Sequence, residues 1–349
     1  MKKLAMLMWA LLASGLCQAG PGPFVVSRGK IDTADYVIVS PTNWNGRLLL
    51  YQHGLNDGSL PPTVDLNVES EPYQSLVAEG WMVAASSYRR SGLIVKDAQT
   101  DVRNLYQHIS KTFGTPKRTL LMGGSMGGAI TIRLIEADPA AFAGAIVLGT
   151  ALELRDGGLA ELTYGAKVPV IFMTNQSEIQ ESATYVKKTA TNAVPAALWI
   201  VERNGHVNFT GPEYVEVVRA LNRWVEGGQI ERERKFAIPV KEPPTTARFT
   251  EQAAFGKVRQ VGGGFGNLSV SFVEADFKQL GIAPGDKFQL GSGGKTYTAT
   301  YANTFTDVPS GQWVGFKAAD GYYVIAIAFG NASQTANLKA GDEIFIRKN

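Results

Sequence analysis

The sequence predicts an α/β domain with a doubly wound, mostly parallel sheet, followed by a smaller, mainly β domain that is barrel-like. From about residue 31 to 227, short apolar runs alternate with amphipathic stretches, which is typical of repeated strand and helix units. After residue 253, short strand-like runs are separated by turns rich in Gly, Asp and Asn, as in small barrels. The length of 349 residues also exceeds that of one ordinary domain.

The first domain contains six nearly continuous apolar runs that are too short for typical helices. Such runs are typical of strands that are buried on both faces of a parallel sheet. They cover residues 46–54, 81–89, 118–124, 143–149, 168–175 and 196–203. Between them, residues 97–113 and 214–225 place their apolar side chains on one helical face, which predicts amphipathic helices.

The stretch "ERERKFAIPVKEPPTT" (231–246) alternates in charge and ends in a proline pair, a composition typical of a linker. Strand-like runs then follow at residues 267–272, 287–293, 295–302, 322–330 and 342–348, with one helical stretch at 274–281. We therefore expect a first domain at residues 20–230, a linker at 231–253 and a second domain at 254–349.

The first nineteen residues have the features of a secretory signal peptide. Two lysines precede an uncharged run from Leu4 to Leu16, and small residues lead to Ala19. The run is too short for a transmembrane helix, so we expect cleavage after Ala19 and a secreted or periplasmic protein without membrane association. Lipidation at Cys17 is the weaker alternative, because Leu16 occupies a position where a small residue is usual.

Composition excludes several other classes of function. Cys17 is the only cysteine, so the cleaved protein would contain neither disulfides nor thiolate metal sites. The net charge of +3 gives no indication of a nucleic-acid partner. The three histidines are far apart in the sequence, and we expect no metal and no organic cofactor. The oligomeric state stays open.

Ser125 is the candidate nucleophile. It lies in "LLMGGSMGGAITI" (120–132), where a Gly-x-Ser-x-Gly pattern joins a strand-like run to an amphipathic stretch. In this context a strained strand-to-helix turn presents the serine oxygen above the sheet. The backbone N–H of Met126 and that of Leu55, after an earlier strand, are the expected donors to an oxyanion.

A serine nucleophile needs a histidine base that is held by a carboxylate. His206 follows the last apolar run and precedes the last predicted helix, as the order serine, acid, histidine requires. His53 more simply shapes a loop. We select Glu178, after the run 168–175, as the acid, with Glu181 and Asp156 as open alternatives.

Residues 31–227 resemble the α/β-hydrolase superfamily through "GGSMGG" and "GHVNFT", and "WNGRLLLYQHG" is similar to the oxyanion segment of feruloyl esterase, tannase-like and peptidase-like relatives. Many members carry an aspartate after a "HGxxD" loop, whereas this sequence has "MTNQSE". The resemblance implies a secreted serine esterase, and the short segment 150–167 leaves no room for a large lid, so we expect small or polymeric ester substrates. A peptidase or a thioesterase is the rival within the same class.

Residues 255–349 resemble the C-terminal domain of the S-adenosylmethionine hydroxide adenosyltransferase family. The resemblance is carried by "GKVRQVGGGFGNLSVSF", "GIAPGDKF", "TYANTFTDVPSG" and "AFGNASQTANLKAGDEIFI". It implies possible ligand-binding residues at Phe265 and Asn267, with the backbone near Asn331 and Ala332. That family's catalytic domain has no counterpart here, and its "DxFGN" is "GGGFGN" in this chain. The alternative function is therefore a binding protein for an adenosine-like ligand with a vestigial hydrolase site.

Overall fold

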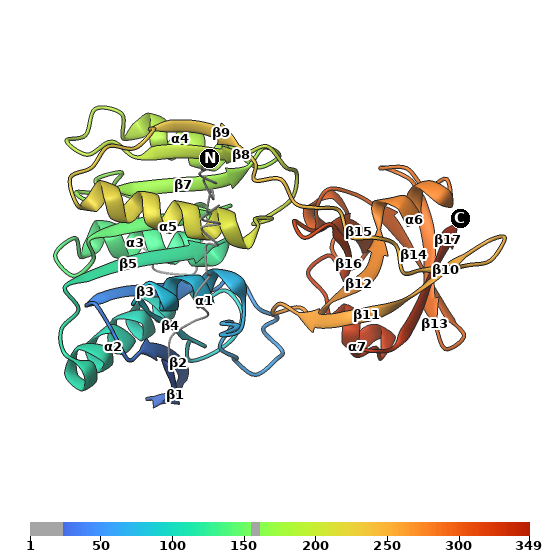
Figure 1. Ribbon diagram of the computed structural model, residues 1–349, viewed down its shortest axis with the longest axis horizontal. Helices are drawn as coiled ribbons and strands as arrows, with labels where there is room; N and C mark the ends of the chain where they lie inside the picture. Colours follow the sequence, from blue (N-terminus) through green and yellow to red (C-terminus); the bar gives the residue numbers. More distant parts are fainter. Residues whose placement is uncertain (1–23, 155–160) are drawn as a thin grey trace, which may run out of the picture.

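The computed structural model describes residues 24–154 and 161–349. The predicted signal peptide lies outside these residues. Figure 1 shows two domains side by side, an α/β domain and a β barrel, with the carboxyl ends of β7 (Val170–Asn175) and β8 (Ala197–Val201) facing the barrel. The predicted fold class is confirmed for both domains.

In the part of the chain that the structure describes, the first domain contains a nine-stranded sheet in the order β1-β2-β4-β3-β5-β6-β7-β8-β9. Pairing is antiparallel between β1, β2 and β4, and parallel from β4 to β9. The remaining elements of this domain are β1 (Phe24–Ile31), β2 (Ala34–Pro41), β3 (Arg47–Gln52), α1 (Glu71–Ala78), β4 (Met82–Ser86), α2 (Val95–Phe113), β5 (Arg118–Gly124), α3 (Met126–Ala137), β6 (Gly144–Leu148), α4 (Gln180–Lys188), α5 (Gly211–Val225) and β9 (Glu233–Phe236).

Helices cover both faces of this sheet, which explains why its central strands are nearly continuously apolar. All residues of β4, β6 and β7 are buried. The core on one face contains residues of α2, α3 and α4, and the core on the other face contains residues of α1 and α5. Because both faces exclude water, these strands lack the polar alternation of a half-exposed strand.

Among the described residues, seven strands close the second domain into a barrel in the order β11-β12-β16-β15-β14-β13-β17, since β17 also pairs with β11. The elements are β10 (Arg248–Phe249), β11 (Ala254–Gly262), β12 (Asn267–Val273), α6 (Glu274–Gln279), β13 (Lys287–Ser292), β14 (Lys295–Tyr301), the 3-10 helix η1 (Phe305–Asp307), β15 (Trp313–Lys317), β16 (Tyr322–Ile327), α7 (Ala332–Ala336) and β17 (Glu343–Lys348). Phe277 of α6 stacks on Tyr323 inside the barrel core, with ring centroids 4.1 Å apart.

The segment 231–253, expected to be a linker, contains two short strands. β9 pairs with β8 at the edge of the first sheet, and β10 pairs with β11 of the barrel. The longest stretch of this segment with neither helix nor strand is residues 237–247. β9 alternates between exposed and partly buried residues, so its composition resembles that of a solvated linker.

In the described ranges, no helix combines the length and apolarity needed to cross a bilayer.

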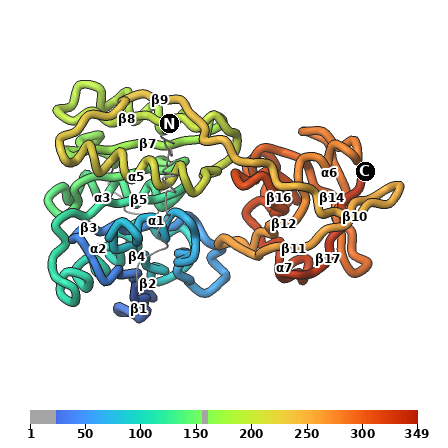
Figure 2. Tube along the Cα trace, viewed as in Figure 1, coloured from blue at the N-terminus to red at the C-terminus, as the bar shows by residue number. Residues whose placement is uncertain are grey.

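The two domains contact each other at the carboxyl edge of the first sheet. Figure 2 shows the segment after β3 reaching the barrel beside β11, where the N–H of Asp57 donates to the carbonyl of Gly264 over 2.9 Å. The loop after β8 is the second contact, since Asn204 donates to Asn303 over 3.0 Å and Asn208 donates to the carbonyl of Lys317 over 3.1 Å. The barrel is therefore held against the loops that follow β3 and β8.

Candidate active site

Ser125 lies in the turn between β5 and α3 with a left-handed backbone, at φ 56° and ψ −122°. Such a conformation costs a residue with a Cβ about 1–3 kcal/mol, so surrounding contacts must hold it. The N–H of Ser125 donates to the carbonyl of Leu148 over 3.0 Å, and its own carbonyl accepts from the N–H groups of Gly128 and Ala129. The strained strand-to-helix turn expected from the sequence pattern is present.

The glycines around Ser125 are required by close backbone packing. A Cβ on Gly123 would lie 2.2 Å from the carbonyl oxygen of Gly127. A Cβ on Gly127 would lie 2.0 Å from the carbonyl oxygen of Gln52, on the neighbouring strand. Both distances are far inside van der Waals contact, so only glycine allows α3 to begin this close to β3 and β5.

His206, after β8, contacts Glu178, after β7. The Nδ1 atom of His206 lies 2.5 Å from Oε2 of Glu178, and Oε1 of Glu178 accepts from the N–H of Val207 over 3.1 Å. Because an ionised carboxylate only accepts hydrogen bonds, Nδ1 carries the proton and Nε2 of the neutral ring keeps its lone pair. The His206 ring is thereby oriented with a basic nitrogen available for proton transfer.

Hydrogen bonds between side chains and backbone fix the relative position of the two loops that carry His206 and Glu178. Asn175 donates to the carbonyl of Asn208 over 3.1 Å, and the N–H of Asn208 donates back to the side chain of Asn175 over 2.8 Å. The N–H of Gly205 also donates to the hydroxyl of Ser177 over 3.0 Å. The contact between histidine and carboxylate is therefore built into the loop conformations.

Ser125 and His206 border one cavity of about 390 Å³. Their proximity depends on the residue after the histidine, because Val207 packs on the turn that holds the serine. A Cβ on Gly124 would lie 3.1 Å from Cγ1 of Val207, and one on Gly149 would lie 2.4 Å from Oε1 of Glu178. The two glycines let the histidine and acid loops approach the serine turn.

The two expected oxyanion donors flank Ser125. Met126 is the first residue of α3, where an N–H has no carbonyl partner within the helix. Leu55 lines the cavity, and a Cβ on the preceding Gly54 would lie 3.3 Å from the Cβ of Ser125. Their role as an oxyanion hole stays a prediction, supported by this placement.

His53 has surroundings that suit a structural role. It is buried, its Nδ1 atom lies 2.8 Å from the carbonyl oxygen of Gly54, and its ring stacks on Tyr88 at 4.1 Å. Burial lowers the pKa of His53, which favours the neutral ring. His53 thus supports the loop that begins at Gly54.

The two alternative acids differ from Glu178 in their surroundings. The carboxylate of Glu181 accepts a hydrogen bond from the N–H of Leu152, and burial raises its pKa. Asp156 lies outside the described residues. Glu178 is therefore the candidate acid that the structure brings into contact with His206.

Two of the four possible ligand-binding residues of the barrel reach the cavity that contains Ser125. Phe265 and Asn267 line it, and Oδ1 of Asn267 is buried without a hydrogen-bond partner in the described part of the chain. The side chain of Asn331 instead caps α7, and Ala332 is buried in the barrel core. Binding of a ligand by these residues stays a prediction.

Sequence reasoning missed two aromatic residues of the barrel that line the same cavity, Phe305 and Phe329. The ring of Phe305 lies edge-on to that of His206, with centroids 5.5 Å apart. Phe329 is 53% exposed and has a φ of 53°. The signal in the sequence was their position in "TYANTFTDVPSG" and "AFGN", two of the stretches that carry the resemblance of the second domain.

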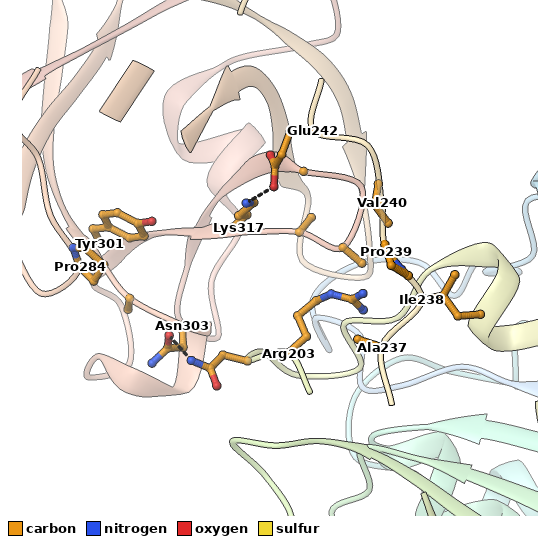
Figure 3. Close-up of a pocket in the computed structure, with 15 residues that line it drawn as sticks. Arg203, Ala237, Ile238, Pro239, Val240, Glu242, Pro284, Tyr301, Asn303 and Lys317 are labelled. Atoms are coloured by element: carbon orange, nitrogen blue, oxygen red, sulfur yellow. Dashed lines mark hydrogen bonds and ion pairs between the residues drawn. The ribbon is translucent and has the colours of Figure 1, made fainter. Parts of the chain in front are cut away.

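A second cavity, of about 350 Å³, lies between residues 237–242 and the barrel and is shown in Figure 3. Its cations are paired: Lys317 points toward Glu242, at 2.5 Å, and Arg203 binds Glu213 at 2.8 Å. Neither Ser125 nor His206 lines this cavity. Its side chains join the domains rather than extend the candidate active site.

Two family models match separate parts of the chain. The family model "Serine aminopeptidase, S33" matches residues 92–190, and "SAM hydroxide adenosyltransferase C-terminal domain" matches residues 256–345. Both resemblances expected from the sequence are confirmed. Among curated proteins, no sequence matches this chain.

Solved structures of several kinds resemble parts of the chain. An uncharacterised conserved protein from Thermotoga maritima has 24% identity and a TM-score of 0.28, covering 40% of this chain and 50% of its own. Dipeptidyl peptidase 4 from Porphyromonas gingivalis has 13% identity and a TM-score of 0.45, with coverages of 60% and 36%. An esterase from Pyrococcus furiosus has 15% identity and a TM-score of 0.45, with coverages of 59% and 98%.

The chain thus spans half of the Thermotoga protein and about a third of the peptidase. The first domain thus has an α/β-hydrolase fold, within which residues 92–190 match the serine aminopeptidase model, and the barrel that follows it is similar to the C-terminal domain of the SAM hydroxide adenosyltransferases.

Proposed function

We propose that this protein is a serine hydrolase that cleaves carboxylic esters through an acyl-enzyme. The observation that carries the proposal is the shared cavity, bordered by Ser125 in its strained turn and by His206. The contact between His206 and Glu178 supports it, because it leaves Nε2 of the ring as a base. The same constellation on this fold suits acyl transfer in general.

In the proposed reaction, the hydroxyl oxygen of Ser125 attacks the ester carbonyl carbon while Nε2 of His206 takes the hydroxyl proton. Glu178 stabilises the imidazolium that forms, and the N–H groups of Met126 and Leu55 donate to the oxyanion. Collapse of the tetrahedral intermediate breaks the bond to the alcohol oxygen, which receives the proton from His206. Water then attacks the acyl-enzyme by the same route, releasing the acid and restoring the serine.

The direct test is labelling of the purified protein with a fluorophosphonate probe, which reacts with activated serines. We expect the wild type to be labelled, and the Ser125→Ala and His206→Ala variants to remain unlabelled. Ser292→Ala is a matched control that should still be labelled, because Ser292 donates to the carbonyl of Glu343 on the barrel and is absent from the cavity lining. A folded wild type without labelling would count against the proposed nucleophile.

Ester preference is tested separately from serine reactivity. Rates with matched ester, thioester and amide substrates of one acyl group distinguish an esterase from a thioesterase or peptidase. We expect the ester to have the highest kcat/KM. A higher kcat/KM for the amide or for the thioester would replace the esterase proposal by the corresponding rival.

The alternative binding function is favoured by one observation, that Phe265 and Asn267 line the cavity. Calorimetry with adenosine and S-adenosylmethionine tests it. Binding without fluorophosphonate labelling would favour the binding protein over the hydrolase.

We also propose that the protein is exported. Mass spectrometry of the expressed protein should show a chain that begins at Gly20. Retention of residues 1–19 would contradict cleavage.

A further inference from the structure

We propose that the barrel completes the substrate-binding cavity of the hydrolase, and that Phe265, Phe305 and Phe329 bind an aromatic group of the substrate beside Ser125. The chemistry of this inference rests on the proposed esterase function. It goes further by naming the substrate class and the residues that select it. Phe265 and Phe329 lie in two turns of the barrel and Phe305 begins the 3-10 helix η1. Each lines the cavity that Ser125 and His206 border.

The three rings form one cluster around Phe329. Its ring meets that of Phe305 at 5.4 Å and 85°, and that of Phe265 at 6.5 Å and 88°. Edge-to-face geometry is the arrangement that aromatic rings prefer, and it leaves ring faces and edges available for a further ring. An aromatic group of the substrate would extend this packing, whereas an alkyl chain would gain only the burial of its apolar surface.

Phe329 has the properties of a residue kept for binding rather than for stability. It is 53% exposed, and its φ of 53° places a bulky side chain in the left-handed region, which is a genuine outlier for such a residue. The turn is held by a bond from the N–H of Gly330 to the carbonyl of Ile327 over 3.0 Å. An exposed aromatic side chain on a strained turn, facing a cavity, indicates that a ligand covers the ring.

Phe305 is held firmly by its own turn. The carboxylate of Asp307 accepts from the N–H groups of Asn303 and Thr304, at 2.9 and 3.1 Å, and Phe305 packs against a small core that contains Val308. The ring therefore projects from a fixed loop toward His206. A group that is bound against Phe305 would lie close to the reacting atoms.

The first domain is shaped to accept the barrel at this position. A Cβ on Gly264 would lie 1.9 Å from Oδ1 of Asn56 and 2.6 Å from its Cα, so a glycine is needed where the barrel turn meets the loop after β3. That loop carries Leu55, the expected oxyanion donor, and its Asp57 donates to the carbonyl of Gly264. The aromatic cluster and the expected oxyanion site are therefore positioned by one contact.

The test compares four esters that place an aromatic or aliphatic group on either side of the ester bond: ethyl acetate, ethyl hexanoate, ethyl phenylacetate and benzyl acetate. We expect at least one aromatic ester to exceed ethyl hexanoate in kcat/KM by about 10-fold, since ring contacts are worth on the order of one tenfold step. A higher kcat/KM for ethyl phenylacetate would show that the rings bind the acyl group, and a higher kcat/KM for benzyl acetate would show that they bind the alcohol group. Equal values for the aliphatic and both aromatic esters would overturn the proposal.

Phe329→Ala and Phe265→Ala are expected to bring the ratio of aromatic to aliphatic kcat/KM close to 1. Phe255→Ala is the matched control, because Phe255 contacts Phe345 elsewhere on the barrel and does not line the cavity; it should preserve the ratio. An unchanged ratio in both cavity variants would overturn the assignment. Circular dichroism establishes that each variant is folded.

A binding measurement separates failure of the cavity from failure of the chemistry. Calorimetry of ethyl phenylacetate and benzyl acetate with Ser125→Ala reports affinity without turnover. We expect adding Phe329→Ala to weaken binding by about 10-fold. If Ser125→Ala binds these esters but the wild type does not hydrolyse them, the aromatic cavity is supported and the esterase function is rejected. If the wild type hydrolyses them and Phe329→Ala causes no loss of affinity, the aromatic cavity alone is rejected.

Discussion

The ring of Phe305, on the barrel, lies edge-on to the ring of His206, on the hydrolase domain, with centroids 5.5 Å apart and planes inclined by 82°. On either side of His206, Asn204 and Asn208 also donate hydrogen bonds to the barrel. The candidate base is thus held from two directions, by Glu178 within its own domain and by the barrel from outside. The second domain is therefore part of the site rather than an appendage.

Replacement of Phe305 by Ala is expected to lower kcat/KM for every ester by about 3- to 10-fold, because an edge-to-face pair contributes about 0.5–1.5 kcal/mol. The loss arises from freedom of the His206 ring, so it should also affect ethyl acetate, which lacks an aromatic group. Steady-state kinetics measures the change, with Phe255→Ala as the control. A loss confined to aromatic esters would show that Phe305 contacts substrate without orienting His206.

Gly264→Ala tests the docking of the barrel on the loop after β3. The added Cβ would meet Asn56 at 1.9 Å, and such overpacking costs about 1–3 kcal/mol. We expect the domains to separate locally, so that proteolysis between residues 237 and 247 becomes faster and the preference for aromatic esters falls. Gly262→Ala is the paired control, since the nearest atom to its added Cβ would lie 3.5 Å away and Gly262 does not line the cavity. Equal effects of the two substitutions would contradict the docking argument.

Much of the first domain could be predicted because strands that are buried on both faces are nearly continuously apolar in the sequence. The apolar runs at 118–124 and 168–175 became β5 and β7, whose residues are almost all buried. The edge elements are different: β1 and β9 alternate between exposed and partly buried residues, and the same composition suits a loop or linker. β1, β2 and β9, toward the two ends of the sheet, were missed, while the six strands between β2 and β9 were found.

Some residues of the candidate site could be predicted from the sequence and others could not. Ser125, His206 and Glu178 follow strands of one sheet, so the order of the strands along the chain was enough to predict that they meet. Phe305 and Phe329 line the same cavity because the barrel docks on the first domain. No periodicity or local motif records that docking, since it depends on shape complementarity at positions such as Gly264.

Glu178→Gln tests whether Glu178 or Glu181 is the acid that supports His206. The amide can no longer stabilise the imidazolium of His206, so we expect kcat/KM to fall by roughly 10³-fold or more. Glu181→Gln should have a far smaller effect, because Glu181 contacts the N–H of Leu152. Thermal unfolding of both variants distinguishes a catalytic loss from misfolding. The reverse order of effects would assign the acid to Glu181.

Glu213→Gln tests a buried ion pair behind the histidine loop. Burial alone would raise the pKa of Glu213, but hydrogen bonds from Arg203, Thr210 and Ile238 outweigh it, and the pKa lies below its usual value of 4.5. The side chain is fully buried, so losing its charge should reduce the free energy of unfolding by about 3 kcal/mol at neutral pH.

The sign of the pH dependence follows from the lowered pKa of Glu213. Its contribution to stability is complete above pH 4.5, the pKa of an ordinary glutamate, and is lost as the pH falls through the lower native value. Urea unfolding should therefore show a difference between wild type and Glu213→Gln that shrinks from about pH 7 to about pH 3. A difference that is constant or grows toward acid would contradict the assigned direction.

Phe329→Asn is expected to separate stability from selectivity. Asparagine tolerates the left-handed region better than a bulky residue does, and the native ring is 53% exposed, so little burial is lost. We expect the free energy of unfolding to remain equal or to rise by about 1 kcal/mol, while the preference for aromatic esters disappears. Phe305→Asn provides the contrast, because Phe305 packs against the small core around Val308 and its replacement should lower the melting temperature. If Phe329→Asn destabilised the protein as much as Phe305→Asn, Phe329 would be a packing residue, and the strained turn would have no functional explanation.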